Sequence, residues 1–240
     1  MSVLRGEDGC PWDKEQTHRS LLPYVIEEAY EVVESVEDGD MNRLCEESGD
    51  LLLQIVFQAQ IAKEAGEFDI KDVCSAINDK LIRRHPHVFS PDGKKLSRPE
   101  EVTRQWEEIK LTQEEGKRES LMDGIPRDLP ALLAAQRVQE RASGVGFDWD
   151  DATGPLEKVS EELGELKSVM NGPREKMKEE MGDILFSVVN FCRFLGINAE
   201  EALRNSVKKF VRRFKKVEEG GFDTTLEIME ERWQNAKNEE

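Results

Sequence analysis

The decisive stretch of this chain is EELGELKSVMNGPREKMKEEMGD at residues 161–183, which has a counterpart in EEAYEVVESVEDGDMNRLCEESGD at residues 27–50. Both stretches run E-E-x-x-E, then about fifteen residues, then E-x-G-D. Helical residues three and four apart lie on one face, so the acids of each motif share a face of their helix. Two antiparallel helices would therefore aim four or five carboxylates at one point.

Such a group of carboxylates needs a counter-charge. Held close together, the acids repel one another, and the arrangement is stable only if some are protonated or if divalent cations lie among them. A set of ligands made only of oxygen suits Mg²⁺ or Mn²⁺ better than zinc. The spacing thus predicts two divalent-cation sites.

The two halves of the chain also match outside the acidic motifs. The offset between matching residues falls steadily from 137 to 127 along the chain, as small deletions would produce. We therefore expect a tandem duplication of one domain. The matching elements are G-x-x-W-D at 9–13 and 146–150, K-x-x-R-R at 80–84 and 209–213, and W-x-x-x-K at 106–110 and 233–237.

The duplication suggests where the domains begin and end. We expect an N-terminal domain at 1–120, a linker at 121–130 and a C-terminal domain at 131–240. The linker segment contains Gly124, Pro126 and Pro130, which interrupt regular structure.

Charge and composition restrict the classes of partner. The 240 residues carry a formal net charge of −17, which argues against binding a nucleic-acid polymer because little counterion release is gained without a basic face. No leading apolar segment resembles a signal peptide, and the longest apolar run, 51–62, is broken by three glutamines. We expect a cytoplasmic protein without a membrane span.

Apolar residues recur at helical spacing in the first copy, over 22–36 and 44–59. Asp40 and Gly66 are expected to cap and stop the second of these helices. A third helix should run from Asp69 to Arg84 and end before Pro86. After a polar loop over 85–98, a helix opened by Pro99 should carry Trp106.

The second copy repeats this order of elements. Thr153 and Pro155 should open its first helix, Pro173 the next, Asn198 with Glu201 the third and Asp223 the last. No alternating β pattern of useful length occurs. The expected fold class is all-α, with four to five helices per copy.

This combination of acidic, basic and Trp-Lys helices, present twice, resembles the MazG family of nucleoside triphosphate pyrophosphohydrolases. The resemblance covers nearly the whole chain and includes C-P-W-D at 10–13 and Q-T-H at 16–18. It implies a helical pyrophosphohydrolase fold, a homodimer, and Mg²⁺-dependent hydrolysis of ribo- and deoxyribonucleoside triphosphates to the monophosphate and pyrophosphate, with nucleotide-pool cleansing as the expected role. By resemblance, the ligands of Mg²⁺, with Mn²⁺ as an alternative ion, are Glu28, Glu31, Glu47 and Asp50 in the first copy and Glu162, Glu165, Glu180 and Asp183 in the second.

The remaining motifs suit the same chemistry. Glu27 and Glu161, on the flank of the acidic groups, are candidates to accept or orient the proton of the attacking water. Lys209 and Arg213, four residues apart on one helical face, are candidates to hold pyrophosphate. Arg83 and Arg84 take this role in the first copy. Further candidate contacts to the nucleotide are Lys80, Trp106, Lys110, Arg212, Trp233 and Lys237, with the tryptophan rings as platforms for the base.

Each assignment has an alternative. The basic residues would also fit an ordinary exposed helix face, and the tryptophans would fit packing or a dimer interface. A ferritin-like di-iron bundle needs paired E-x-x-H motifs, and only Glu15 and His18 have that spacing. A non-enzymatic helical module with decayed sites is the other rival, although both copies keep complete sets of acids and bases. Base preference would depend on the shape of a pocket that no motif specifies.

Overall fold

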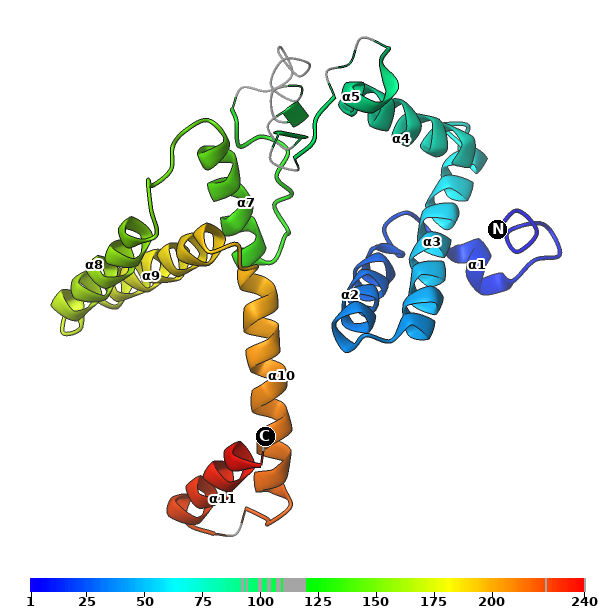
Figure 1. Ribbon diagram of the computed structural model, residues 1–240. Helices are drawn as coiled ribbons and strands as arrows, with labels where there is room; N and C mark the ends of the chain where they lie inside the picture. Colours follow the sequence, from blue (N-terminus) through cyan, green and yellow to red (C-terminus); the bar gives the residue numbers. More distant parts are fainter. Residues whose placement is uncertain are drawn as a thin grey trace. The chain divides into compact units, whose positions relative to one another are not determined.

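The computed structural model of the chain describes residues 1–91, 93, 95–98, 101–102, 105–106, 109, 120–222 and 224–239. The chain forms two compact units, Met1–Trp106 and Glu107–Glu240. Each unit is built from helices alone in its described residues (Figure 1). The predicted all-α duplication is thereby confirmed, while the linker at 121–130 stays a prediction.

The first unit is organised around an antiparallel helical hairpin made by α2 and α3 (Figure 1). The turn between them passes through Gly39, whose φ of 70° lies in the left-handed region that favours glycine. Helix α3 packs against α4, and α4 against the short α5. The elements are α1 (Pro11–Glu15), α2 (Leu22–Asp38), α3 (Met41–Glu64), α4 (Ile70–Arg84) and α5 (Pro86–Phe89).

The helix ends of this unit follow the predicted caps. The Asp40 carboxylate accepts hydrogen bonds from the backbone N–H groups of Asn42 and Arg43, each at 3.0 Å. Asp69 forms a reciprocal capping box with Asp72. Helix α4 ends at Arg84, before Pro86. Local side-chain acceptors therefore set where α3 and α4 begin.

The second unit repeats the hairpin with α8 and α9, which pack side by side (Figure 1). Helix α7 packs against α9, α10 contacts α7 and α9, and α11 packs against α10. The Asn198 side chain accepts a hydrogen bond from the N–H of Glu201 at the start of α10, as expected. The elements are α7 (Ala131–Gly144), α8 (Thr153–Val169), α9 (Arg174–Phe194), α10 (Ala199–Glu218) and α11 (Leu226–Asn238).

Some expectations fall on residues outside the described part of the chain. Pro99, Lys110 and Asp223 belong to this group. Helix α7 was not expected from the sequence, and neither were α1 and α5 as separate short helices. Among these three, α7 matters most because it packs against α9, which carries Glu180 of the second acidic group.

Much apolar surface remains outside the two cores. Ile26 and Leu52 on the first hairpin are 59% and 58% exposed, and Leu185 and Phe210 in the second unit are each 54% exposed. Searched over the described residues, the chain has no helix of the length and apolarity that a membrane crossing requires. Cytoplasmic location stays a prediction.

Candidate metal and nucleotide site

The first acidic cluster lies between α2 and α3. Glu28 and Glu31 on α2 and Glu47 on α3 each offer one carboxylate oxygen, and these oxygens all lie within 4.8 Å of one another. Partial burial, followed by the charges of Asp50, Glu31 and Glu47, raises the pKa of the Glu28 carboxyl above its ordinary value. Asp50 thus acts electrostatically on the same cluster.

The second cluster repeats this arrangement between α8 and α9. Glu162 and Glu165 on α8 and Glu180 on α9 again offer oxygens within 4.8 Å of one another. Glu162 is buried, with 5% of its surface exposed. Partial burial, then the charges of Glu165, Asp183 and Glu162, raises the pKa of Glu180. The structure therefore brings together three of the expected ligands in each copy and places the fourth within electrostatic reach.

The composition of the clusters fits a hard divalent cation. Every donor is a carboxylate oxygen, and burial, together with the charges of the neighbouring acids, raises the pKa values of Glu28 and Glu180. Oxygen donors at this spacing suit Mg²⁺ or Mn²⁺. The residues present therefore fit the implied ion.

A lysine that the motifs did not single out lies on the second cluster. The Lys158 ammonium contacts the Glu162 carboxylate at 2.8 Å and Glu161 at 3.0 Å. The hydrogen bond to Glu162, then the one to Glu161, raises the pKa of Lys158. The spacing of four residues from Lys158 to Glu162 could have indicated this pair. The corresponding residue of the first copy, 134 positions earlier, is Tyr24.

The first cluster has its own cation, on the other helix of its hairpin. The Arg43 guanidinium contacts Glu34 at 2.6 Å and Glu47 at 3.2 Å. Hydrogen bonds to Glu34 and then Glu47 raise the pKa of Arg43. The two clusters thus differ in the acid that the neighbouring basic residue contacts, which is Glu47 of the second helix in the first copy and Glu162 of the first helix in the second copy. Glu27, like Glu161, has an exposed position on the flank of its cluster.

The basic helices and tryptophans form a second group of predicted site residues. In α10 the Arg213 guanidinium lies 5.9 Å from the centre of the Trp233 ring, and Phe210 lies 5.0 Å from that ring between centroids. In the first unit Trp106 packs edge-on against His85, with centroids 5.1 Å apart, and its Nε1 is buried without a hydrogen-bond partner. Both tryptophans therefore pack at the end of, or along, the basic helix of their copy.

The charged members of this group lie mostly at the surface. In the structure, Arg213 contacts Trp233, and Lys158 contacts Glu161 and Glu162. One site that holds both the acidic cluster and the basic residues with their tryptophan stays a prediction. Arg84 and Arg213 are half-buried, and the exposed members are Lys80, Arg83, Lys209, Arg212 and Lys237.

The fold and the two clusters define the class, which is an all-α protein that presents a duplicated acidic helical hairpin. The chain belongs to the MazG family. The family model, described as the MazG nucleotide pyrophosphohydrolase domain, matches residues 16–89 and 153–218. These two segments contain both acidic clusters and both basic helices.

Full-length relatives support the same assignment. A Thermotoga maritima protein named nucleoside triphosphate pyrophosphohydrolase/pyrophosphatase MazG is 49% identical over 245 residues, covering 99% of this chain and 92% of its own. An Escherichia coli K12 protein named nucleoside triphosphate pyrophosphohydrolase is 47% identical over 254 residues, covering 100% of this chain and 95% of its own. The Bacillus subtilis protein YabN is 45% identical over 246 residues, which form 50% of its length.

Proposed function

We propose that this protein is a Mg²⁺-dependent pyrophosphohydrolase that converts nucleoside triphosphates, ribo- and deoxyribo-, to the nucleoside monophosphate and pyrophosphate. The observation that carries the proposal is the pair of carboxylate clusters, each with oxygens from two helices within 4.8 Å. The names of the Thermotoga and Escherichia coli relatives point to the same reaction. Cleansing of the nucleotide pool is the role that this activity would serve.

Bound Mg²⁺ would neutralise phosphate oxygens and lower the pKa of water. Glu162, Glu165, Glu180 and Asp183 would hold the ion in the second copy, and Glu28, Glu31, Glu47 and Asp50 in the first.

The flanking residues would complete the site. Glu161 and Glu27 orient the attacking water and accept its proton. Lys158 contacts both Glu161 and Glu162, so it keeps Glu161 beside the cluster. Lys209 and Arg213 would hold the leaving pyrophosphate, as would Arg83 and Arg84 in the first copy.

We also propose a homodimer. Each hairpin leaves large aliphatic side chains exposed, with Ile26 at 59% and Leu185 at 54%, and a second copy could cover such a face. Leu203 and Val207 of α10 are likewise exposed, at 53% and 54%.

Metal dependence is the direct test of the proposed function. Turnover of nucleoside triphosphates, followed by separate detection of pyrophosphate and phosphate, should vanish in EDTA and return with Mg²⁺ or Mn²⁺. Asp183→Asn should remove most of the turnover of the second site while the far-UV circular dichroism stays helical. Full activity in EDTA would contradict the metal role, and release of phosphate alone would contradict the reaction.

A further inference from the structure

One carboxylate of the first acidic cluster is bonded to an arginine of its own helix. The Arg43 Nε donates to Glu47 Oε1 at 3.2 Å, and Glu47 is one of the three residues whose oxygens converge between α2 and α3. Only 14% of the Glu47 side chain is exposed. A carboxylate expected to ligate the divalent cation therefore already has a cationic partner and little free surface.

The start of α3 fixes the position of Arg43. The Asp40 carboxylate caps the helix and accepts a hydrogen bond from the backbone N–H of Arg43 at 3.0 Å. Glu47 follows Arg43 by four residues, so the two side chains lie on the same face of α3. The contact between the guanidinium and Glu47 thus follows from the geometry of one capped helix.

The guanidinium has two further acidic partners, both on α2. Its Nη2 donates to Glu34 Oε2 at 2.6 Å, and its Nη1 lies 3.8 Å from Asp38 Oδ2. Neither acid belongs to the expected ligands of the ion. Arg43 can therefore release Glu47 and still keep a charge-assisted hydrogen bond to Glu34.

The second copy has different residues at these positions. At the offsets of the duplication, Ser168 stands in the place of Glu34, and Lys176 stands in the place of Arg43. The Ser168 Oγ donates to the backbone carbonyl of Glu165 at 2.7 Å. A neutral hydroxyl cannot anchor a basic side chain as a carboxylate does, so an arginine anchored in this way is a feature of the first copy.

A bound ion and the Arg43 guanidinium would repel each other. Two cations that share one carboxylate lie a few ångströms apart, where like charges interact strongly unless water screens them. The Glu47 side chain is mostly shielded from water, so this screening is weak. Binding of an ion to Glu47 is therefore favoured once the guanidinium has left that carboxylate.

We propose that Arg43 is the counter-ion of Glu47 in the metal-free first site, and that it determines the concentration of divalent cation that this site needs. When the ion binds, the Glu47 oxygen leaves the guanidinium, and the guanidinium stays on Glu34. This inference rests on the metal role proposed for the first cluster. It predicts that removing Arg43 makes the first site bind the ion more tightly.

Direct measurement of ion binding tests the proposal. Every protein carries Glu180→Gln and Asp183→Asn, which remove two expected ligands of the second site, and the chain with these two changes alone is the parent. Mn²⁺ binding is followed by the electron paramagnetic resonance signal of the free ion, and Mg²⁺ binding by calorimetry. Arg43→Met should bind both ions about tenfold more tightly than the parent, because partners of a ligand typically change metal affinity by about 10- to 100-fold.

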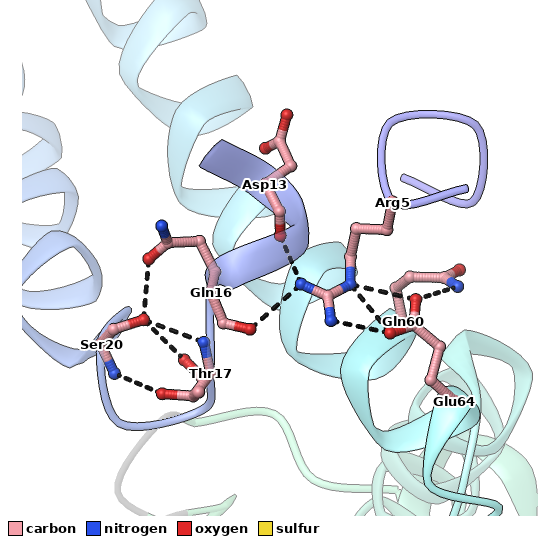
Figure 2. Close-up of polar contacts among 7 residues, drawn as sticks. All are labelled: Arg5, Asp13, Gln16, Thr17, Ser20, Gln60 and Glu64. Carbon is pink, nitrogen blue, oxygen red and sulfur yellow. Dashed lines mark hydrogen bonds and ion pairs between the residues drawn. The ribbon is translucent and has the colours of Figure 1, made fainter. Parts of the chain in front are cut away.

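Arg5 provides a matched control on the same helix (Figure 2). Its guanidinium bonds the Glu64 carboxylate at 2.7 to 3.0 Å and donates to the backbone carbonyls of Asp13 and Gln16, the latter at 3.1 Å. Glu64 follows Glu47 by 17 residues, which is roughly 25 Å of helix rise. Arg5→Met removes the same charge and an ion pair with α3, but it should leave the affinity for Mn²⁺ unchanged.

Thermal melts separate the exchange at Glu47 from a general loss of stability. In EDTA, Arg43→Met should melt below the parent, because Glu34 and Glu47 lose a cationic partner. The rise in melting temperature on adding Mg²⁺ should be larger in Arg43→Met than in the parent, whereas Arg5→Met should lose stability without this larger rise. Arg43→Gln, which is also uncharged, takes the place of Arg43→Met if the latter does not fold in EDTA.

The outcomes separate this proposal from the proposed function. Unchanged or weaker Mn²⁺ binding in Arg43→Met overturns the exchange, and equally tighter binding in Arg5→Met would overturn it by tracing the effect to net charge. If neither the parent nor Arg43→Met binds the ions, both the exchange and the metal role of the first cluster fail. If binding tightens as expected but the unaltered chain releases no pyrophosphate, the exchange stands and the proposed reaction fails.

Discussion

At the scale of single residues, the charges on α9 determine how the protein responds to pH and to cations. Glu180 is pushed towards protonation by burial and by the acids around it, while Asp148 is held ionised by its donors. Helix α9 thus carries one carboxyl that weakens the fold at neutral pH and one arginine, Arg193, whose ion pair with Asp148 in the turn before α8 strengthens it.

Glu180→Gln should raise the melting temperature of the metal-free protein at neutral pH. The pKa of Glu180 is raised in the folded state, so the group favours folding when protonated, and that contribution is lost as pH rises through the raised value. The gain should shrink at acidic pH, and the increase in melting temperature caused by Mg²⁺ should be smaller than in the wild type. Differential scanning fluorimetry with EDTA or MgCl₂ measures both. A melting temperature in EDTA no higher than that of the control Glu179→Gln would contradict this origin of the gain.

Asp148→Asn should destabilise the second unit by about 1–2 kcal/mol at neutral pH, as expected for a part-buried, charge-assisted pair. Burial raises the pKa of Asp148, but hydrogen bonds from Arg193, Ser143 and the N–H of Trp149 outweigh it and lower the pKa below its ordinary value. Its stabilisation is therefore present above the ordinary pKa of about 4 and is lost as pH falls through the lower folded value.

Urea unfolding of wild type and Asp148→Asn at a series of pH values tests whether the stabilisation by Asp148 is lost as pH falls. The gap between wild type and Asp148→Asn should close at acidic pH, and Asp150→Asn should leave stability within about 0.5 kcal/mol of the wild type. A gap that widens as pH falls would mean that the ion pair is not its origin.

At the scale of elements, helix ends depend on single side chains. Asp40→Ala removes the acceptor of two N–H groups at the start of α3 and should cost about 1 kcal/mol. Asp40→Asn, which keeps an acceptor, should cost much less. Denaturant midpoints compare the two, and equal losses would show that the cap is not the cause.

Local rules explain which elements could be predicted from the sequence. The start of α3 at Asp40, the end of α4 before Pro86 and the cap of α10 at Asn198 follow from neighbouring residues. Helix α7 follows Pro130 without a side-chain cap, so no such signal marks its beginning.

The same division applies to the candidate site. The convergence of the acids could be predicted from the sequence. In each copy the expected ligands lie at helical spacing on two helices that follow one another, and three of the four meet in the structure. The hydrogen bond from Gln139 on α7 to the Phe186 carbonyl on α9 could not be predicted, because it depends on packing between α7 and α9, which are far apart in sequence. The contact of Lys158 with Glu162 could be predicted only in part. The two residues are four apart, which allows an ion pair on one helix, but the same spacing is common on exposed helices that hold no site.

At the scale of the whole molecule, the two copies keep all their acids but differ around them. We predict two competent sites with different substrate ranges, the second carrying the main activity. Glu28→Gln and Glu162→Gln should each lower turnover of a different set of nucleotides, with the larger loss for Glu162→Gln. A screen of ribo- and deoxyribonucleoside triphosphates compares them. Loss of turnover with every substrate from either change alone would indicate one coupled site.

Assembly is the other prediction at this scale. Light scattering at low micromolar concentration should give the mass of two 27.5 kDa chains. Leu52→Glu and Leu185→Glu, on the exposed hairpin faces, should shift the equilibrium towards one chain. A monomeric wild type at this concentration would contradict the homodimer.

The hairpin architecture of each cluster has a consequence for how the protein folds. The first and last acids that meet at one point are separated by fewer than 20 residues in either copy. Closing so short a loop costs little chain entropy, and contacts of low sequence separation form early. The carboxylates therefore converge in the same step in which the two helices pack against each other. A divalent cation present during synthesis would speed this step as well as occupy the site.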